Sequence, residues 1–169
     1  MSRWTANRSE NLLYPPLKDL LNIGLKKARD QGMKVYLFEG FRDKERQEWL
    51  YAKGRTISGP IVTNARYGRS WHNVGLAVDL VFDGSPSRGI QWSWEGDYIK
   101  DAISDYERLG PILVSTGLDW YGDSKRFPEM PHFQLTLGMS INYAQRLLHE
   151  EGQLAIWREM DKRLAQKKV

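Results

Sequence analysis

The chain has 169 residues, of which 41% are hydrophobic and 27% are charged, and these values fit one soluble globular domain over residues 1–169. It contains no cysteine, which excludes disulfide bonds and thiolate metal ligands. The formal net charge is +4, but the basic residues form no block interleaved with aromatic residues, so nucleic-acid binding is not expected. No apolar run approaches the roughly 20 residues that cross a bilayer, and the N-terminus lacks the apolar core of a signal peptide. We therefore expect synthesis in the cytosol and no membrane insertion.

The first half of the chain predicts two helices and two longer strands from the spacing of apolar residues and from glycine and proline punctuation. In chain order we expect a helix over 15–31, a strand over 33–38, a helix capped by Asp43 that reaches residue 53, a loop over 56–70 with a short strand at 61–63, and a buried strand over 75–82.

The second half predicts further helices around one short strand. In chain order we expect a loop over 84–96, a helix over 97–109, a short strand or helix end at 112–114, a loop over 117–131, a strand over 132–137, and one long helix from the cap Ser140 to residue 165 despite Gly152. Helices at both ends around short strands favour an α+β domain, with helices packed on a small, mainly antiparallel sheet. No composition shift marks a linker or a second domain.

The segment Ser70–Asp79 carries the most informative residues. It places His72, one of only three histidines, seven residues before Asp79, which interrupts an otherwise apolar strand. A buried carboxylate must be paired, hydrogen-bonded or bound to a metal. A bend at Gly75 would return His72 to the face that carries Asp79. Taken alone, the pattern also allows Asp79 to pair with an arginine such as Arg42.

A second histidine, His132, lies far downstream in the motif Glu129-Met130-Pro131-His132-Phe133. Two histidines and one carboxylate form a three-ligand set for a catalytic zinc ion, which keeps one position for water. Pro131 pushes Met130 into an extended conformation, so Glu129 and His132 do not share a helix. Residues three apart on a strand face opposite sides, so Glu129 reaches the site only if the chain turns before His132. The third histidine, His149, is expected on the polar side of the last helix.

Four blocks of residues occur in a characteristic order. They are Gly40-Phe41-Arg42-Asp43, Gln47 with Leu50-Tyr51, Ser70-x-His72-x-x-Gly75-Leu76-Ala77-x-Asp79, and Glu129-x-Pro131-His132-Phe133. Together they resemble the zinc peptidases of the D-alanyl-D-alanine carboxypeptidase and L-alanyl-D-glutamate endopeptidase family, which includes VanY-like peptidases and phage endolysins. The resemblance covers roughly residues 15–137.

The resemblance implies that one zinc ion (Zn2+) per chain is bound by His72, Asp79 and His132. Glu129 would be the general base, at a position where many endolysin-like members carry aspartate. Arg42 would stabilise the negative charge that develops on the substrate carbonyl oxygen. Zinc lowers the pKa of bound water to about 7, and Glu129 would take the water proton and return it to the departing amine.

Other polar and aromatic residues are candidates for substrate contact. Gln47 and Ser70 match polar positions of the family, with expected roles in substrate binding and ligand support. Trp120 shortly precedes the last ligand and either lines the substrate groove or packs against the core. Arg66 and Arg69 are expected to be solvated loop charges rather than contacts for a substrate carboxylate.

The resemblance predicts a peptidoglycan hydrolase that cleaves the L-alanyl-D-glutamate bond of the stem peptide. The compact chain, with no separate wall-binding module, favours a monomeric bacteriolytic enzyme of the endolysin type that acts on the cell wall after its release. A D,D-carboxypeptidase or dipeptidase acting on D-alanyl-D-alanine has the same metal chemistry and remains an alternative. A non-catalytic zinc-containing binding module, similar to the signalling domain of Hedgehog proteins, is a second alternative. The presence of both Glu129 and Arg42 argues against that module.

Overall fold

The computed structural model describes residues 5–84, 89–91, 104–125 and 128–167. At its centre is a five-stranded sheet in the order β1-β2-β5-β4, with β3 also paired to β2. All strand pairs in this part of the chain are antiparallel, which confirms the expected α+β class with a mainly antiparallel sheet. The strands are β1 (Val35–Glu39), β2 (Ala77–Gly84), β3 (Gly89–Gln91), β4 (Asp119–Trp120) and β5 (His132–Gln134).

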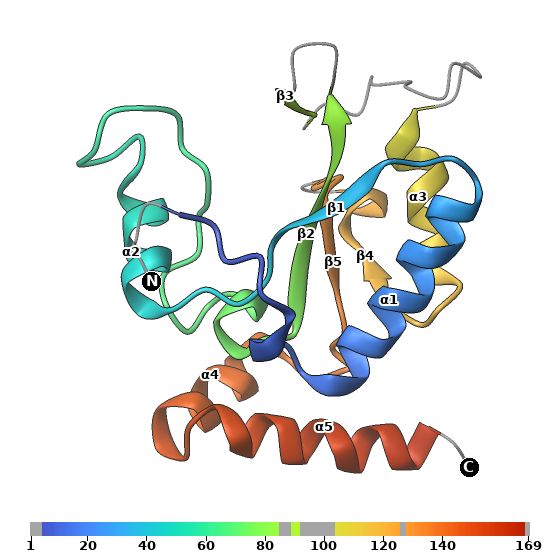
Figure 1. Cartoon of the computed structure of the whole chain (residues 1–169). Helices are drawn as coiled ribbons and strands as arrows, with labels where there is room; N and C mark the ends of the chain where they lie inside the picture. Colours follow the sequence, from blue (N-terminus) through green and yellow to red (C-terminus); the bar gives the residue numbers. More distant parts are fainter. Residues whose placement is uncertain (1–4, 85–88, 92–103, 126–127, 168–169) are drawn as a thin grey trace.

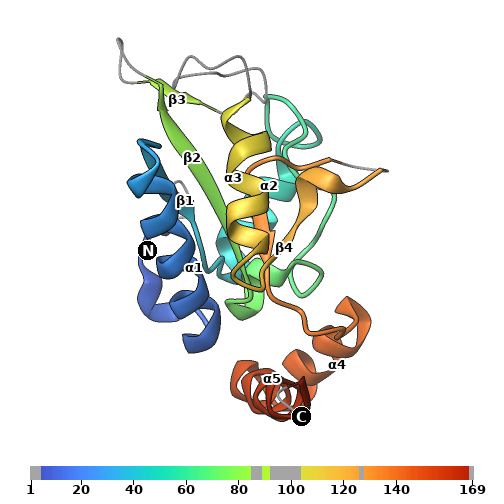
Figure 2. The ribbon, with the colours of Figure 1, turned by 90° about the vertical axis from the view of Figure 1, so that its right-hand side faces the viewer.

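The helices surround this sheet on three sides (Figures 1 and 2). Helices α1 and α3 lie beside each other on one face, α2 lies on the other side, and α4 and α5 lie below the end of the sheet. None of the described helices is long and apolar enough to span a bilayer. The helices are α1 (Pro15–Asp30), α2 (Lys44–Ala52), α3 (Asp105–Val114), α4 (Ile141–Glu150) and α5 (Gln153–Lys167), with short 3₁₀ helices η1 (Glu10–Leu12), η2 (Trp71–Val74) and η3 (Tyr121–Asp123).

The two faces of β2 have different chemistry, as the alternation of its side chains requires. Val78, Leu80 and Phe82 point into the hydrophobic core that α1 and α3 cover. Asp79 belongs to the opposite face, and its paired neighbours on that face come from β1 and β5. The central strand therefore joins the apolar core on one side to a polar site on the other.

The N-terminal half largely agrees with the sequence prediction. Helix α2 begins after Asp43, whose side chain accepts a hydrogen bond from the backbone N–H of Arg46, so the predicted cap is confirmed. The short strand expected at 61–63 is wrong, because Ile61 and Val62 are more than half exposed and pair with no strand of the described chain.

Three predictions in the second half need correction. The loop expected over 84–96 contains β3, which pairs with β2 beyond the end of β5, and the loop over 117–131 contains β4. Helix α3 begins at Asp105 and continues through Pro111 to Val114, so 112–114 is a helix end; residues 97–103 lie outside the described part. Burial of Leu109 and Leu113 offsets the hydrogen bond that Pro111 removes.

The single long C-terminal helix is also wrong, because the chain forms α4 and α5. Gly152 has a left-handed φ of 84°, and the backbone N–H groups of Glu151 and Gly152 both donate to the carbonyl of Leu147, so α4 ends before this glycine. The break redirects α5 so that side chains of Gln153 and Trp157 donate to the carbonyl oxygen of Val74 in η2. The last helix thus stabilises the segment that carries His72.

Gly75 gives a test of the turn that follows η2. Its φ of 72° is left-handed, and a methyl group there would overlap the backbone oxygen of Leu12. We expect Gly75→Ala to lower the free energy of unfolding by about 2–4 kcal/mol, measured by urea denaturation. Gly138→Ala is the matched control, since its φ is 76° and nothing lies within 4 Å of the added carbon. Equal losses of unfolding free energy in both variants would show that the overlap with Leu12 contributes nothing to the effect of Gly75→Ala.

Candidate metal centre

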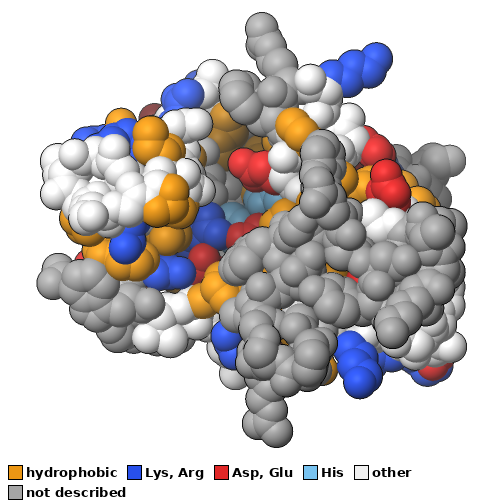
Figure 3. Space-filling view, turned by 90° about the horizontal axis from the view of Figure 1, so that it is seen from above, with side chains coloured by type: hydrophobic (Ala, Val, Ile, Leu, Met, Phe, Trp, Pro, Cys, Tyr) orange, Lys and Arg blue, Asp and Glu red, His pale blue; other side chains and the backbone are white. Residues whose placement is uncertain are grey.

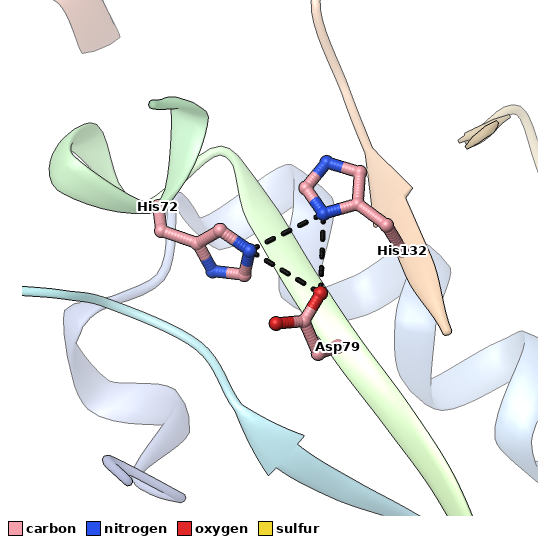
Figure 4. A group of neighbouring side chains, drawn as sticks. All are labelled: His72, Asp79 and His132. Carbon is pink, nitrogen blue, oxygen red and sulfur yellow. Dashed lines mark hydrogen bonds and ion pairs between the residues drawn. The ribbon is translucent and has the colours of Figure 1, made fainter. Parts of the chain in front are cut away.

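Strand register brings Asp79 and His132 together. Asp79 on β2 lies directly opposite His132 on β5, and residues paired in this way project from the same face of the sheet. His72 reaches them from η2, which Gly75 ends in a left-handed turn before β2 begins. Figure 4 shows the three side chains converging from the 3₁₀ helix and the two strands. The turn at Gly75 and the strand register together produce the arrangement that the motif predicted.

The three side chains present one ligand atom each at nearly equal separations. Nε2 of His72 lies 3.3 Å from Nδ1 of His132 and 3.4 Å from Oδ1 of Asp79, and that oxygen lies 3.1 Å from Nδ1 of His132. A tetrahedral zinc ion with bonds of about 2.0–2.2 Å holds its ligand atoms about 3.3–3.6 Å apart. The spacing and the nitrogen and oxygen donor set therefore fit a zinc ion with three protein ligands.

Neighbouring groups hold both imidazoles in the required orientation. Nδ1 of His72 lies 2.7 Å from the carbonyl oxygen of Gly40, which can only accept, so Nδ1 carries the proton and Nε2 is free to bind a metal. Nε2 of His132 lies 3.2 Å from Oε1 of Gln134, which leaves Nδ1 as the ligand atom. His72 and His132 therefore use different ring nitrogens.

Burial and the surrounding charges determine how the three groups ionise. Burial lowers the pKa of His72, and the Arg42 guanidinium lowers it further. Burial acts to raise the pKa of Asp79, but His72 and Arg42 outweigh it and hold that pKa well below its usual value. For His132, burial acts to lower the pKa, but the hydrogen bond to Asp79 and the charge of Asp79 outweigh burial and raise it. Asp79 is therefore ionised at neutral pH, and its charge favours the protonated form of His132.

These shifts predict how zinc binding responds to pH. Because the pKa of His132 is raised, chiefly by its hydrogen bond to Asp79 against the effect of burial, the metal-free protein holds a proton there to higher pH than a free imidazole does, and zinc must displace that proton. We expect zinc affinity to rise as pH increases from about 6 to 8, with release of protons on zinc binding. Calorimetry in buffers of different ionisation enthalpy measures this proton. An affinity independent of pH over that range would contradict the assignment of Nδ1 of His132 as a ligand atom.

The turn before His132 places Glu129 beside the cluster. The backbone N–H of His132 donates to the carbonyl of Glu129, so residues 129–132 form the turn that the sequence required. The Glu129 carboxylate lies 4.0 Å from Nδ1 of His132, and its side chain is 60% exposed. A carboxylate at this position is next to the candidate metal ligands and open to solvent.

Arg42 lies on the other side of Asp79. Its Nη2 donates to Oδ2 of Asp79, and its Nε donates to Glu39 at 2.8 Å. Asp79 therefore combines the two possibilities left open by the sequence, because one oxygen pairs with Arg42 while the other faces His72 and His132. In Figure 3 the histidines lie in a hollow of the molecular surface, with acidic and basic side chains beside them.

Comparison with known proteins agrees with this geometry. The model of the D-alanyl-D-alanine carboxypeptidase family, VanY, matches residues 13–104. The peptidoglycan L-alanyl-D-glutamate endopeptidase CwlK of Bacillus subtilis (strain 168) is 39% identical over 126 residues, which cover 73% of each chain. The chain belongs to the VanY family. The resemblance predicted from the sequence motifs is thereby confirmed.

A solved structure of another peptidase resembles this VanY-family chain. The L-Ala D-Glu endopeptidase ChiX of Serratia marcescens aligns with a TM-score of 0.53 and 26% sequence identity. The alignment covers 79% of this chain and 89% of that one. The common architecture extends over most of both chains.

The three predicted substrate-binding residues lie in different environments. Gln47 is fully buried, and its amide donates to the carbonyl of Ala65. Ser70 is half-buried at the start of η2. Trp120 donates to the carbonyl of Met130, and added methyl groups on the neighbouring glycines 110 and 122 would overlap its ring. Substrate contact by these residues stays a prediction, while the hydrogen bonds of Gln47 and Trp120 support the loops around the site.

The loop arginines and His149 agree with the sequence expectation. The side chain of Arg66 is 66% exposed and lies 3.7 Å from Glu48. Arg69 donates to Gln145 on the surface, and His149 is exposed on α4.

Sequence reasoning missed several residues of this VanY-family site. Glu39 is an acidic residue at the end of an apolar strand, the same signal that identified Asp79, but the predicted strand ended at residue 38 and left it out. Gln134 lies two residues after His132, on the same face of β5. The ring of Tyr121 meets the His132 imidazole edge-on at 5.4 Å between centroids. Alternation along the strands could have identified Glu39 and Gln134, whereas Tyr121 required the tertiary structure.

Proposed function

We propose that this chain is a zinc-dependent peptidoglycan peptidase that hydrolyses the L-alanyl-D-glutamate bond of the stem peptide. The observation that carries the proposal is the triangle formed by Nε2 of His72, Oδ1 of Asp79 and Nδ1 of His132, with the Glu129 carboxylate beside it. The choice of bond is supported by CwlK, which is named for it and is 39% identical. Zinc is the metal favoured by a donor set of nitrogen and oxygen with room for a further ligand.

The residues of the site have complementary roles in this reaction. When bound, zinc acts as a Lewis acid and lowers the pKa of a water molecule to about 7. Glu129 takes a proton from the attacking water and returns it to the departing amine. Its carboxylate is exposed, so it can reach both the water and the amine. Arg42 supplies N–H donors to the oxygen that becomes negative on the substrate carbonyl. Asp79 and Gln134 hold Arg42 and His132 in the orientations that these steps require.

The bond that is cut decides between the proposed activity and its alternative. A defined muropeptide with an intact pentapeptide stem is incubated with the zinc-loaded protein, and the products are identified by mass spectrometry. We expect a peptide with a new N-terminal D-glutamate and a muramoyl fragment that ends in L-alanine. Release of terminal D-alanine alone would assign the chain as a D,D-carboxypeptidase, and no release with zinc bound would favour a binding module.

Native mass spectrometry tests the remaining expectations together. We propose one zinc ion per chain, as the triangular site found among the described residues suggests, and a monomeric, single-domain enzyme. The spectrum reports the metal content and the number of chains in the same measurement. Clearing of intact bacteria by added protein, compared with clearing of purified walls, tests the proposed bacteriolytic action on the cell wall.

A further inference from the structure

A buried carboxylate that the mechanism above does not use lies behind Arg42. The Glu39 side chain is only 2% exposed, and each of its oxygens accepts a hydrogen bond from a different arginine. Oε2 accepts from Nε of Arg42 at 2.8 Å, and Oε1 accepts from Nε of Arg46 at 2.7 Å. The Arg46 guanidinium in turn lies over the ring of Trp49, 5.1 Å from its centroid. Glu39 therefore joins Arg42 to a packed anchor on α2.

Strand register puts Glu39 level with the metal centre. In the ladder between β1 and β2, Glu39 pairs with Asp79, and Asp79 pairs in turn with His132 on β5. An irregularity in β1 between Leu37 and Glu39 shifts the register there. The shift brings an acidic side chain opposite Asp79 on the polar face. Carboxylates from two neighbouring strands thus hold Arg42 from two directions.

The contacts made by Glu39 determine the orientation of the guanidinium group. The backbone of Arg42 is already held, since its N–H donates to the carbonyl of His72 and its carbonyl accepts from the Asn73 side chain. Its long side chain still has several rotatable bonds, and these must be ordered before the guanidinium takes one orientation. Because the guanidinium is planar, hydrogen bonds from Nε to Glu39 and from Nη2 to Asp79 define its plane. Within the described part of the chain, Nη1 and the second hydrogen of Nη2 are then the donors left for a substrate.

The balance of buried charges gives a second reason to expect that Glu39 holds Arg42 in place. The buried set comprises two carboxylates, Glu39 and Asp79, and two guanidinium groups, Arg42 and Arg46, so it is balanced. Without the charge on Glu39, Arg42 would keep only Asp79 as a carboxylate partner in this set, and Arg46 would lose its ion pair with Glu39. Removing one member of a buried ionic network leaves the others uncompensated, and they move to relieve it.

We propose that Glu39 is a positioning residue that acts on catalysis through Arg42. It holds the guanidinium plane so that the free N–H donors face the reacting carbonyl while Asp79 keeps Oδ1 for the metal. The inference rests on the proposed function, because it takes Arg42 as the group that stabilises the oxyanion.

A double-mutant cycle tests this role. Glu39→Gln keeps the shape of the side chain and removes its charge. We expect kcat to fall by roughly 30-fold with KM changed by less than about 3-fold, as for an interaction that matters in the transition state. In the Arg42→Ala background the same change is expected to have almost no further effect, because the group that Glu39 positions is gone. If the loss of kcat in the double variant equals the product of the two single-variant losses, the proposal is overturned.

Matched variants separate charge, shape and folding. Glu45→Gln makes the same chemical change at an exposed position on α2 and is expected to leave kcat unchanged. Glu39→Asp keeps the charge and is expected to recover part of the lost rate. If Glu39→Gln does not fold, Arg46→Gln releases the opposite oxygen of Glu39 and is expected to lower kcat about 5-fold, again only when Arg42 is present. A loss that persists without Arg42 would overturn the proposal.

A measurement on the protein without substrate separates this inference from the proposed function. The Nε–H group of Arg42 gives an NMR signal whose position depends on its hydrogen bond to Glu39. We expect that signal to shift in Glu39→Gln and to stay in place in Glu45→Gln, in both metal-free and zinc-loaded protein. An unchanged signal would overturn the positioning role. If the wild-type protein cleaves no muropeptide while the signal shifts as expected, the proposed function fails and the orientation of Arg42 by Glu39 is retained.

Discussion

Replacing Glu129 by alanine is expected to lower kcat for stem-peptide hydrolysis by roughly 1,000-fold while zinc content stays near one per chain. The carboxylate lies 4.0 Å from Nδ1 of His132 yet is 60% exposed, so it is placed to move protons and contributes little to packing. The melting temperature should therefore change by no more than about 2 °C. Hydrolysis of a defined muropeptide, elemental analysis and thermal unfolding measure the three quantities.

Variants of the same position sharpen this test. Glu129→Gln keeps the size and polarity of the side chain but cannot take a proton, so we expect it to be nearly as inactive as Glu129→Ala. Glu129→Asp keeps the proton acceptor on a shorter side chain and should retain more activity than either. Glu150→Ala, at the exposed end of α4, is the control for removal of a surface glutamate. Full activity in Glu129→Gln would remove Glu129 from the mechanism as a base.

The second large effect is expected at Asp79, where one substitution affects both metal binding and folding. Asp79→Asn removes the charge that faces His72 and His132 and also the partner of Arg42. Zinc binding free energies of about 10–16 kcal/mol over four ligands give roughly 3 kcal/mol for each. We therefore expect zinc affinity to fall by about 100-fold or more, measured by competition with a chelator.

Folding of the same variant distinguishes the two contributions. In metal-free protein, Asp79→Asn leaves the Arg42 guanidinium without one of its two carboxylate partners, which is expected to cost about 3 kcal/mol of stability. Denaturant unfolding in the presence of a chelator measures this loss without any contribution from zinc. His132→Ala is the comparison, since it removes a ligand but leaves the pair of Arg42 and Asp79 intact. Equal stability of wild type and Asp79→Asn without metal would show that this ion pair does not stabilise the fold.

The parts of the fold that were predictable are those governed by local patterns. The cap at Asp43 and the amphipathic helix α1 follow from residue type and spacing within one or two turns. The C-terminal helix pair did not, because a single glycine within an amphipathic run is compatible with either a continuous helix or a break. Contacts of Gln153 and Trp157 with the carbonyl of Val74 favour the break, and these residues lie about 80 positions apart in the chain.

The candidate site divides in the same way. His72, Asp79 and His132 were identified from unusual residues in apolar surroundings and from their resemblance to a known pattern, and the structure brings the three together. The turn that aims Glu129 was a stated condition, and the hydrogen bond from His132 to its carbonyl meets it. Glu39 was missed because its significance depends on strand register, which an irregularity in β1 alters.

The family, the α+β class and the types of residue that carry the chemistry could be predicted from the sequence, because these depend on composition, spacing and order along the chain. The ring nitrogen of each histidine that faces the candidate metal position, and the double contact of Asp79 with Arg42 and the histidines, became visible in the folded chain. The contact of Glu39 with Arg42 became visible there as well. These features depend on antiparallel pairing of distant segments, and the hydrogen bonds involved exist only after β1, β2 and β5 lie side by side.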